Sequence, residues 1–152
     1  MWARQGSLFG MAEPAVDVEF ANVERTALDD ASWVEFAGGW LDGADAVFDE
    51  LVSSLPLRQR TDIKMYDRLV DEPRLSAWWR GDRHRHVVTD PVVAIVSVGA
   101  ERPLRLRPRG GGVSRSWRLG HGDLFVMGGA CQHDWEHTVP KVRHAEPRMS
   151  IT

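Results

Sequence analysis

The stretch Pro91–Val98 constrains the fold most. Its sequence is Pro-Val-Val-Ala-Ile-Val-Ser-Val. β-branched residues dominate it, and a short continuous apolar run of this kind is typical of a strand buried on both faces. Such a strand needs neighbours at both edges and a layer packed against it. The sequence therefore predicts that Pro91–Val98 is the central strand of a sheet.

Later segments supply the neighbours. Leu104–Arg107 alternates apolar and basic residues with a period of two, three glycines follow, and Ser114–Leu119 returns as a second strand, so we expect a hairpin. Leu124–Met127 and Arg148–Thr152 are predicted as two more strands. Strands and helices do not alternate along the chain, so a parallel α/β fold has no support. The pattern predicts an antiparallel sandwich or jelly roll.

One helix is predicted before these strands. Asp42 can cap its N-terminus, and the apolar residues of Ala44–Leu55 recur at helical spacing. Pro56 then ends it. The predicted fold class is therefore mainly β with a flanking helix (α+β).

The length of 152 residues fits one domain with a single substantial core, and 43% of the residues are apolar. Residues 1–32 are predicted as a loosely structured N-terminal arm, with a short strand at Val16–Phe20 where apolar and acidic residues alternate. Residues 33–152 are predicted to form a single jelly-roll domain.

Several features bear on the compartment. No apolar run approaches the roughly 18 residues that a membrane span needs, and the acidic N-terminal region lacks the basic start of a signal peptide. Cys131 is the single cysteine, which fits a reducing compartment. We therefore expect a soluble, cytoplasmic protein without a membrane partner, and we predict no particular oligomeric state.

Charge is distributed unevenly along the chain. Residues 1–60 hold 4 basic and 11 acidic groups, whereas residues 61–152 hold 15 and 11. A polyanion such as nucleic acid could bind the second part. The alternative is a solvated, arginine-rich strand face. The region in question holds six arginines: Arg102, Arg105, Arg107, Arg109, Arg115 and Arg118.

Some side chains in this second part match the parts of a non-haem iron site. Such a site typically binds Fe(II) with two histidines and one carboxylate, leaving positions for a co-substrate and oxygen. Asp82 and His137 are candidate metal ligands, and Arg148 is a candidate partner for a dicarboxylate.

Longer runs carry a more specific signal. They read LPLRQRTDIKMYDRLVDEPRLSAWW, TDPVVAIVSVG, LRLRPRGGGVSRSWRLGHGDLFVMGGACQHDWEHTVPKV and PRMSIT, and they cover most of residues 55–152. In this order they resemble the catalytic domain of bacterial AlkB-type dioxygenases, which use Fe(II) and 2-oxoglutarate. The resemblance implies a double-stranded β-helix, a form of jelly roll, and this agrees with the strand pattern.

The resemblance also implies roles for single residues. His137 matches the distal metal histidine, and Asp82 matches the carboxylate of a His-x-Asp pair. Arg148 matches the arginine that pairs with the far carboxylate of 2-oxoglutarate. The implied reaction decarboxylates 2-oxoglutarate to succinate and hydroxylates an N-alkyl group on a base, after which the alkyl carbon leaves as an aldehyde.

The implied partner is alkylated DNA or RNA, and the implied process is DNA repair. The family builds a nucleotide-recognition lid where this chain has Met65, Tyr66 and the Trp78-Trp79 pair. These residues are therefore candidate nucleotide contacts.

The chain departs from the family pattern at three places. Arg80 stands where the family has the first histidine of His-x-Asp, and a guanidinium has no lone pair to give a metal. The family also carries several dozen residues, including an Asn-x-Tyr segment that helps to bind 2-oxoglutarate, where Trp79 here runs straight into Arg80. Finally, the family has a second arginine six residues after Arg148, beyond Thr152. An incomplete jelly roll with impaired or lost activity follows from these departures.

Substitute ligands are conceivable. Asp82 and His84 are two residues apart, so on a strand they would face the same side and, with His137, restore two histidines and a carboxylate. Alternatively, His84, His86 and His137 would form a three-histidine set like that of cupins. The structural alternative is that His84 and His86 are loop histidines beside arginines.

Two other interpretations stay open at this stage. One is a non-catalytic jelly-roll module that binds nucleic acid or a protein partner through its arginine-rich face. The other is a chain whose fold is incomplete, because the loss of a strand-bearing segment exposes sheet edges.

Overall fold

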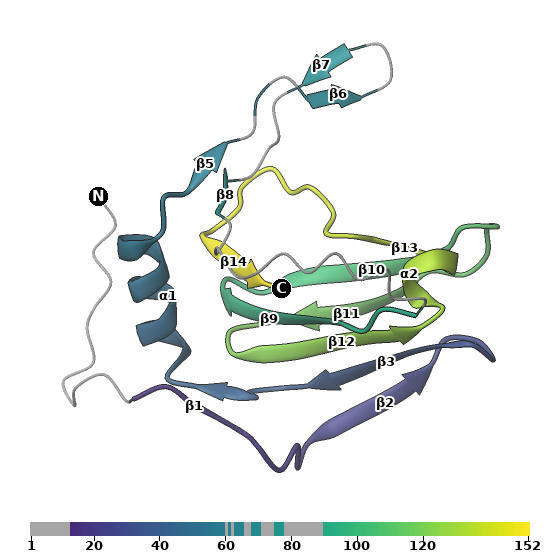
Figure 1. Ribbon diagram of the computed structural model, residues 1–152, viewed down its shortest axis with the longest axis horizontal. Coiled ribbons are helices and arrows are strands. Elements are labelled where there is room, and N and C mark those ends of the chain that lie inside the picture. Colours follow the sequence, from purple (N-terminus) through teal and green to yellow (C-terminus); the bar gives the residue numbers. More distant parts are fainter. Residues whose placement is uncertain (1–12, 60, 62, 66–67, 71–74, 78–89) are drawn as a thin grey trace. The chain divides into compact units, whose positions relative to one another are not determined.

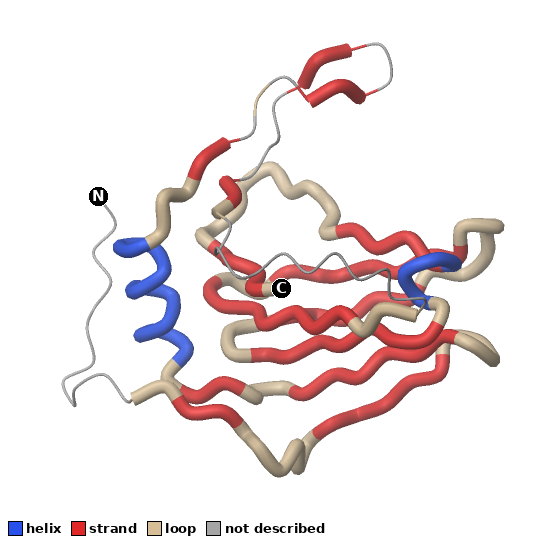
Figure 2. The backbone as a smooth tube through the Cα atoms, in the orientation of Figure 1, coloured by secondary structure: helices blue, strands red, loops and turns tan. Residues whose placement is uncertain are grey.

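The computed structural model describes residues 13–59, 61, 63–65, 68–70, 75–77 and 90–152, shown as a ribbon in Figure 1 and by secondary structure in Figure 2. For residues 63–65, 68–70 and 76 it describes the backbone alone. The chain divides into two compact units, one of Met1–Phe48 with Val88–Thr152 and the other of Asp49–Val87.

The first unit contains a five-stranded antiparallel sheet. Its strand order is β14 (Arg148–Ile151), β9 (Val93–Gly99), β12 (Asp123–Gly129), β3 (Ser32–Ala37) and β2 (Val23–Ala27) (Figure 1). The strand β9 pairs with β12 on one side and β14 on the other. The prediction of a central strand at this position is therefore confirmed, as are the predicted strands that became β12 and β14.

A three-stranded antiparallel sheet lies in the same unit, in the order β11 (Arg115–Leu119), β10 (Arg102–Pro108) and β13 (Trp135–Thr138). The pairing of β10 with β11 confirms the predicted hairpin. A short helix, α2 (Cys131–Asp134), joins β12 of the larger sheet to β13 of the smaller one.

The inner faces of the two sheets share one hydrophobic core. Phe125 and Met127 of β12 and Leu106 of β10 are fully buried in it. Burial of an aliphatic or aromatic side chain of this size stabilises the fold by roughly 1.5–3 kcal/mol. Leucines and arginines alternate along β10, so Leu104 and Leu106 face this core. This antiparallel sandwich is the architecture of a jelly roll and confirms the predicted fold class.

The predicted helix is α1 (Ala44–Ser54), which follows β4 (Leu41–Asp42). Asp42 lies at its N-terminus, where a carboxylate oxygen accepts a hydrogen bond from the Gly43 amide at 2.8 Å. Ala44 and Phe48 pack with Leu41 and with Val98 of β9 in a second hydrophobic cluster. In the part of the chain that the structure describes, no helix has the length and apolar character needed to cross a membrane.

The structure corrects the prediction for the N-terminal region. A strand at Val16–Phe20 was expected, but β1 (Ala15–Val16) ends where Asp17 begins a turn. The Asp17 carboxylate accepts hydrogen bonds from the amides of Glu19 and Ala21, which holds the chain in a turn rather than a strand. Strand β2, within the predicted arm, instead pairs along β3 and forms one edge of the sheet.

The second unit contains two short antiparallel strand pairs. β5 (Arg58–Gln59) pairs with β8 (Leu75–Ser76), and β6 (Ile63–Met65) pairs with β7 (Arg68–Val70).

Candidate functional site

The predicted site residues differ in how far the structure describes them. His137 and Arg148 belong to the described part, and Met65 is the last residue of β6, with its backbone alone described. The remaining predicted residues lie outside the described residues: Asp82, His84, Tyr66 and Trp78, together with Arg80, His86 and Trp79. Their roles stay predictions.

His137 lies on β13 and faces the space between the two sheets. It pairs with Leu106, and directly paired residues of antiparallel strands point to the same side. Leu106 is fully buried in the core, so the imidazole projects from the inner face of the smaller sheet. It is nevertheless exposed, since β13 is the last strand of this sheet in the described part. The imidazole has no hydrogen-bond partner among the described residues and is accessible to a metal.

A polar anchor fixes the start of β13. The indole Nε1 of Trp135 donates to Asp29 at 2.7 Å, and the same carboxylate accepts the amides of Ala31 and Ser32. The hydrogen bond from Trp135 is the main reason why the pKa of Asp29 is lower than usual. Since Trp135 is buried, this anchor holds in place the strand that carries His137.

Arg148 lies on β14 and faces the same interior from the larger sheet. Its Nε and Nη2 donate to the Ser97 hydroxyl at 3.1 and 2.8 Å. Ser97 is only 1% exposed and lies on β9, the strand that pairs with β14. Burial lowers the pKa of Arg148, and the nearby positive charge of Arg102 lowers it further. A half-buried cation held by a neutral hydroxyl suits an anionic ligand.

The two ends of the expected site therefore lie on facing sheets. Among the described residues, no three histidine, cysteine or acidic side chains gather closely enough to hold a metal ion. An iron ion at His137 thus requires ligands from outside the described residues, such as Asp82. The half-buried guanidinium of Arg148, in contrast, would fit a carboxylate of a bound dicarboxylate.

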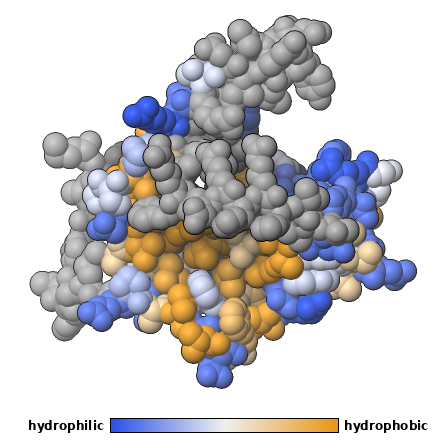
Figure 3. Space-filling model, viewed as in Figure 1, coloured by the Kyte–Doolittle hydropathy of each residue, from blue (hydrophilic) through white to orange (hydrophobic). Residues whose placement is uncertain are grey.

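A pocket of about 610 Å³ opens beside His137. Its lining includes Arg105, Arg107 and Arg109 along with Glu136, which accepts a hydrogen bond from Arg107 Nη2 at 2.8 Å. In Figure 3, hydrophilic residues gather on the side of the view where Figure 1 places α2 and the loop between β10 and β11. The pocket is therefore basic, with one acidic group in it.

Strand register divides the six arginines that the sequence grouped together. Arg105, Arg107 and Arg118 lie on the outer face of the smaller sheet. Arg102 is paired with the buried Leu119 and Arg115 with the buried Leu106, so these two lie on the inner face. Sequence reasoning missed the separate position of Arg102 and Arg115. The signal was present in the alternation of β10, where even-numbered positions face inward.

Sequence reasoning also missed Ser97. It is the only polar residue in the run Val92–Val98, and a hydroxyl in a strand buried on both faces needs a hydrogen-bond partner. That requirement could have marked Ser97 as part of a polar site, although not which residue it contacts.

Comparison with known proteins gives a consistent result. The family model of the 2OG-Fe(II) oxygenase superfamily matches residues 76–152. Alpha-ketoglutarate-dependent dioxygenase alkB homolog 3 from Bos taurus is 28% identical over 173 residues, covering 72% of this chain and 60% of the bovine protein. The proteins of the same name from Homo sapiens and Mus musculus are 36% identical over 87 residues, covering 51% of this chain and 30% of theirs.

The bovine match has an internal difference in length. It extends over 173 positions yet takes in only 72% of the 152 residues here, so the bovine protein carries several dozen residues without a counterpart within the matched region. This chain also spans less than two thirds of the length of each of these relatives.

Proposed function

Because the chain belongs to the 2OG-Fe(II) oxygenase superfamily and is an AlkB-type member of it, we propose that it dealkylates nucleic-acid bases by oxidation, with 2-oxoglutarate as co-substrate. The observation that carries this proposal is the hydrogen-bonded pair of the half-buried Arg148 and the buried Ser97, on the sheet facing His137. The pair provides an anion-binding group inside the sandwich, where a dicarboxylate can reach both a metal and a cation.

Each residue has a distinct part in the proposal. His137 and Asp82 would hold Fe(II), which together with O2 would supply the chemistry that converts 2-oxoglutarate to succinate and CO2 and hydroxylates the alkyl carbon. Arg148 binds the far carboxylate, and Ser97 orients the guanidinium through two hydrogen bonds. The aromatic and aliphatic side chains of the core exclude water from this end of the site.

Iron binding is expected to be weak. Arg80 occupies the position of a metal histidine and cannot coordinate, so Fe(II) would be held by fewer protein ligands than usual unless His84 contributes. We therefore propose that turnover is low rather than typical of the family.

Nucleic acid could bind the basic pocket, whose Arg105 and Arg107 lie on the face of the smaller sheet opposite the one from which the His137 imidazole projects. Arg105, Arg107 and Arg109 line it together with His137, so a nucleic-acid phosphate could bind near the strand that carries the metal histidine. Met65, Tyr66 and Trp78 remain the proposed contacts to the base, on the strength of the family resemblance alone.

Succinate formation tests the proposal. Purified protein is supplied with Fe(II), 2-oxoglutarate and an oligonucleotide that contains an N-methylated base, and succinate is quantified. We expect low succinate formation that rises with the oligonucleotide and is absent in His137→Ala. Robust succinate formation by the unmodified protein would contradict the expectation that its activity is impaired. Arg80→His should raise the rate without restoring it fully, and full recovery would show that the missing internal segment is dispensable.

A second candidate is a non-catalytic module that binds nucleic acid, favoured by the three arginines of the pocket. It predicts iron-independent binding of single-stranded DNA whose affinity falls steeply with salt. Absence of binding at low salt would remove this candidate, and binding without any succinate formation would favour it over the enzyme.

A further inference from the structure

Arg102 lies at the same end of the sandwich as Arg148. Only Ala100 and Glu101 separate the last residue of β9, Gly99, from Arg102, the first residue of β10. Gly99 is in turn the residue paired with Arg148 across the larger sheet. The turn between the two sheets therefore brings both arginines to one place, and each projects from an inner face.

The guanidinium of Arg102 is only partly satisfied. One terminal nitrogen donates to the carbonyl oxygen of Pro140, three residues after His137. Its Nε is buried and has no hydrogen-bond partner among the described residues. Buried donors in native proteins almost always have partners, so an orphaned guanidinium N–H next to a candidate binding site indicates a missing acceptor.

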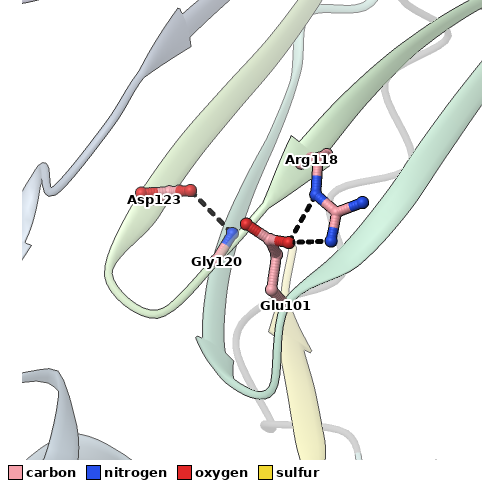
Figure 4. A network of polar contacts seen from close by, with 4 residues as sticks. All are labelled: Glu101, Arg118, Gly120 and Asp123. Carbon is pink, nitrogen blue, oxygen red and sulfur yellow. Dashed lines mark hydrogen bonds and ion pairs between the residues drawn. The ribbon is translucent and has the colours of Figure 1, made fainter.

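No acidic side chain of the described residues is paired with either arginine. Glu101, next to Arg102 in sequence, instead points to the outer face and pairs with Arg118 (Figure 4). The same figure shows Asp123 engaged with the amide of Gly120, at 2.6 Å. The nearby acids are thus already committed to other partners.

The positive charge of Arg102 makes the charged form of Arg148 less favourable. The pKa of Arg148 is lowered by burial and then by the positive charge of Arg102, which means that the two cations are close and uncompensated. An anion placed between them would satisfy the free Nε and relieve the repulsion.

We propose that Arg102 is a second co-substrate-binding residue, whose guanidinium binds the far carboxylate of 2-oxoglutarate from the side opposite Arg148. This inference rests on the proposed function and deepens it. The far carboxylate then lies between two cations and the Ser97 hydroxyl, so the site selects 2-oxo diacids over 2-oxo monoacids of the same length. The contact of Arg102 with Pro140 also ties this carboxylate site to the segment that follows the strand of His137.

Two ligands that differ only at the far end test this role. Calorimetric titrations with Mn(II), which supports binding without turnover, compare 2-oxoglutarate with 2-oxopentanoate, in which a methyl group replaces the far carboxylate. Arg102→Met should weaken 2-oxoglutarate binding by roughly ten- to hundred-fold, the loss expected for a charge-assisted hydrogen bond. Binding of 2-oxopentanoate should change by less than about twofold, because Arg102 makes no contact with its methyl end.

Matched variants separate this role from other effects. Arg25→Met removes one positive charge from the edge strand β2, where Arg25 pairs with Glu35, and should leave the affinity for both ligands unchanged. Arg102→Lys keeps the positive charge but loses the forked donors of the guanidinium, so its affinity for 2-oxoglutarate should lie between those of Arg102→Met and the unmodified protein. If Arg102→Met does not fold, the affinity of Arg102→Lys tests the role of Arg102.

Three results would overturn the inference. The first is an unchanged preference for 2-oxoglutarate over 2-oxopentanoate in both Arg102 variants. The second is an equal loss of affinity for the two ligands. The third is the absence of 2-oxoglutarate binding by the unmodified protein. Because no turnover is measured, diacid selectivity that depends on Arg102 supports the inference even if the protein forms no succinate. Conversely, turnover with unchanged selectivity supports the proposed function and removes this inference.

Discussion

At the scale of single residues, Arg148 is the side chain on which the proposed chemistry depends most. It is a half-buried cation whose hydrogen bonds within the described residues go to the neutral hydroxyl of Ser97. Its strand faces, across the core, the strand that carries His137. Buried charges are normally paired, so a guanidinium without an acid in the described residues indicates a ligand.

Replacement of Arg148 should therefore affect the co-substrate more than the fold. Arg148→Met is expected to weaken 2-oxoglutarate binding by roughly 1.5–3 kcal/mol, which is about ten- to hundred-fold in the dissociation constant. Titration of the purified variant measures this. Arg143→Met, at an exposed loop position, is the control for the lost charge. Equal affinity of the Arg148 variant and the control would contradict the assignment.

Cys131 is buried, and its thiol is expected to be unreactive in the folded protein. Burial, and to a lesser extent the charge of Asp29, raises the pKa of its thiol from 9.0 to about 11. The thiol is therefore protonated at neutral pH and should react slowly with iodoacetamide at pH 8 in the native protein and quickly in denaturant. It is the only cysteine, so labelling followed by mass spectrometry reads this site alone. Rapid native labelling would show that the thiol is accessible.

At the scale of elements, the pairing of β9 with β14 depends on one glycine. Gly99 has a φ of +96°, and a Cβ there would lie 2.5 Å from the carbonyl oxygen of Pro147. Gly99→Ala should cost about 1–3 kcal/mol of stability and displace the neighbouring Arg148, which weakens 2-oxoglutarate binding as well.

Gly110 offers the matched control. It lies in the loop after β10, and a Cβ there would meet no atom within 4 Å. Gly110→Ala should leave both the unfolding free energy and the affinity for 2-oxoglutarate close to those of the unmodified protein. Chemical denaturation and ligand titration measure the two quantities. Similar behaviour of the two alanine variants would show that β14 tolerates displacement.

The anchor of β13 has a pH dependence of defined sign. In the folded protein the pKa of Asp29 is held below its ordinary value of 3.8. Its contribution to stability is therefore present above that value and is lost as the pH falls through the folded pKa. Asp29→Ala should destabilise the protein by about 1 kcal/mol at pH 7, because the carboxylate is exposed and water can partly replace it. The difference in unfolding free energy between Asp29→Ala and the unmodified protein should shrink in acid. Chemical denaturation at pH 7 and at an acidic pH measures this difference. A difference that stays constant with pH would contradict the role of the ionised carboxylate.

The sequence predicted elements with strong local patterns. The β-branched run of β9, the alternation of β10 and the apolar spacing of α1 each follow from their own residues. The strand β13 was not predicted as a separate element, because three of its four residues are exposed and polar and give no hydrophobic period. The residues of β2 are likewise mostly exposed and polar, so they give no hydrophobic period, although β2 pairs with β3, the next strand along the chain.

At the scale of the whole molecule, the candidate site is assembled from segments far apart in sequence. His137 and Arg148 were identified through family resemblance, and the structure places them on inner faces of opposing sheets. Ser97 and Arg102 could not be found that way, because their contacts depend on the register of β9 with β14 and on the turn into β10. Register is set by which faces are buried, and that is a property of the packed sandwich rather than of any one strand.

The central claim is that this AlkB-type chain carries out 2-oxoglutarate-dependent dealkylation of nucleic acid. The most direct measurement is the mass of an oligonucleotide with one N-methylated base after incubation with the protein, Fe(II), 2-oxoglutarate and oxygen. We predict slow loss of the methyl group that matches succinate formed, is faster with Arg80→His and is absent with His137→Ala. An oligonucleotide that keeps its methyl group with both the unmodified protein and Arg80→His would contradict the claim.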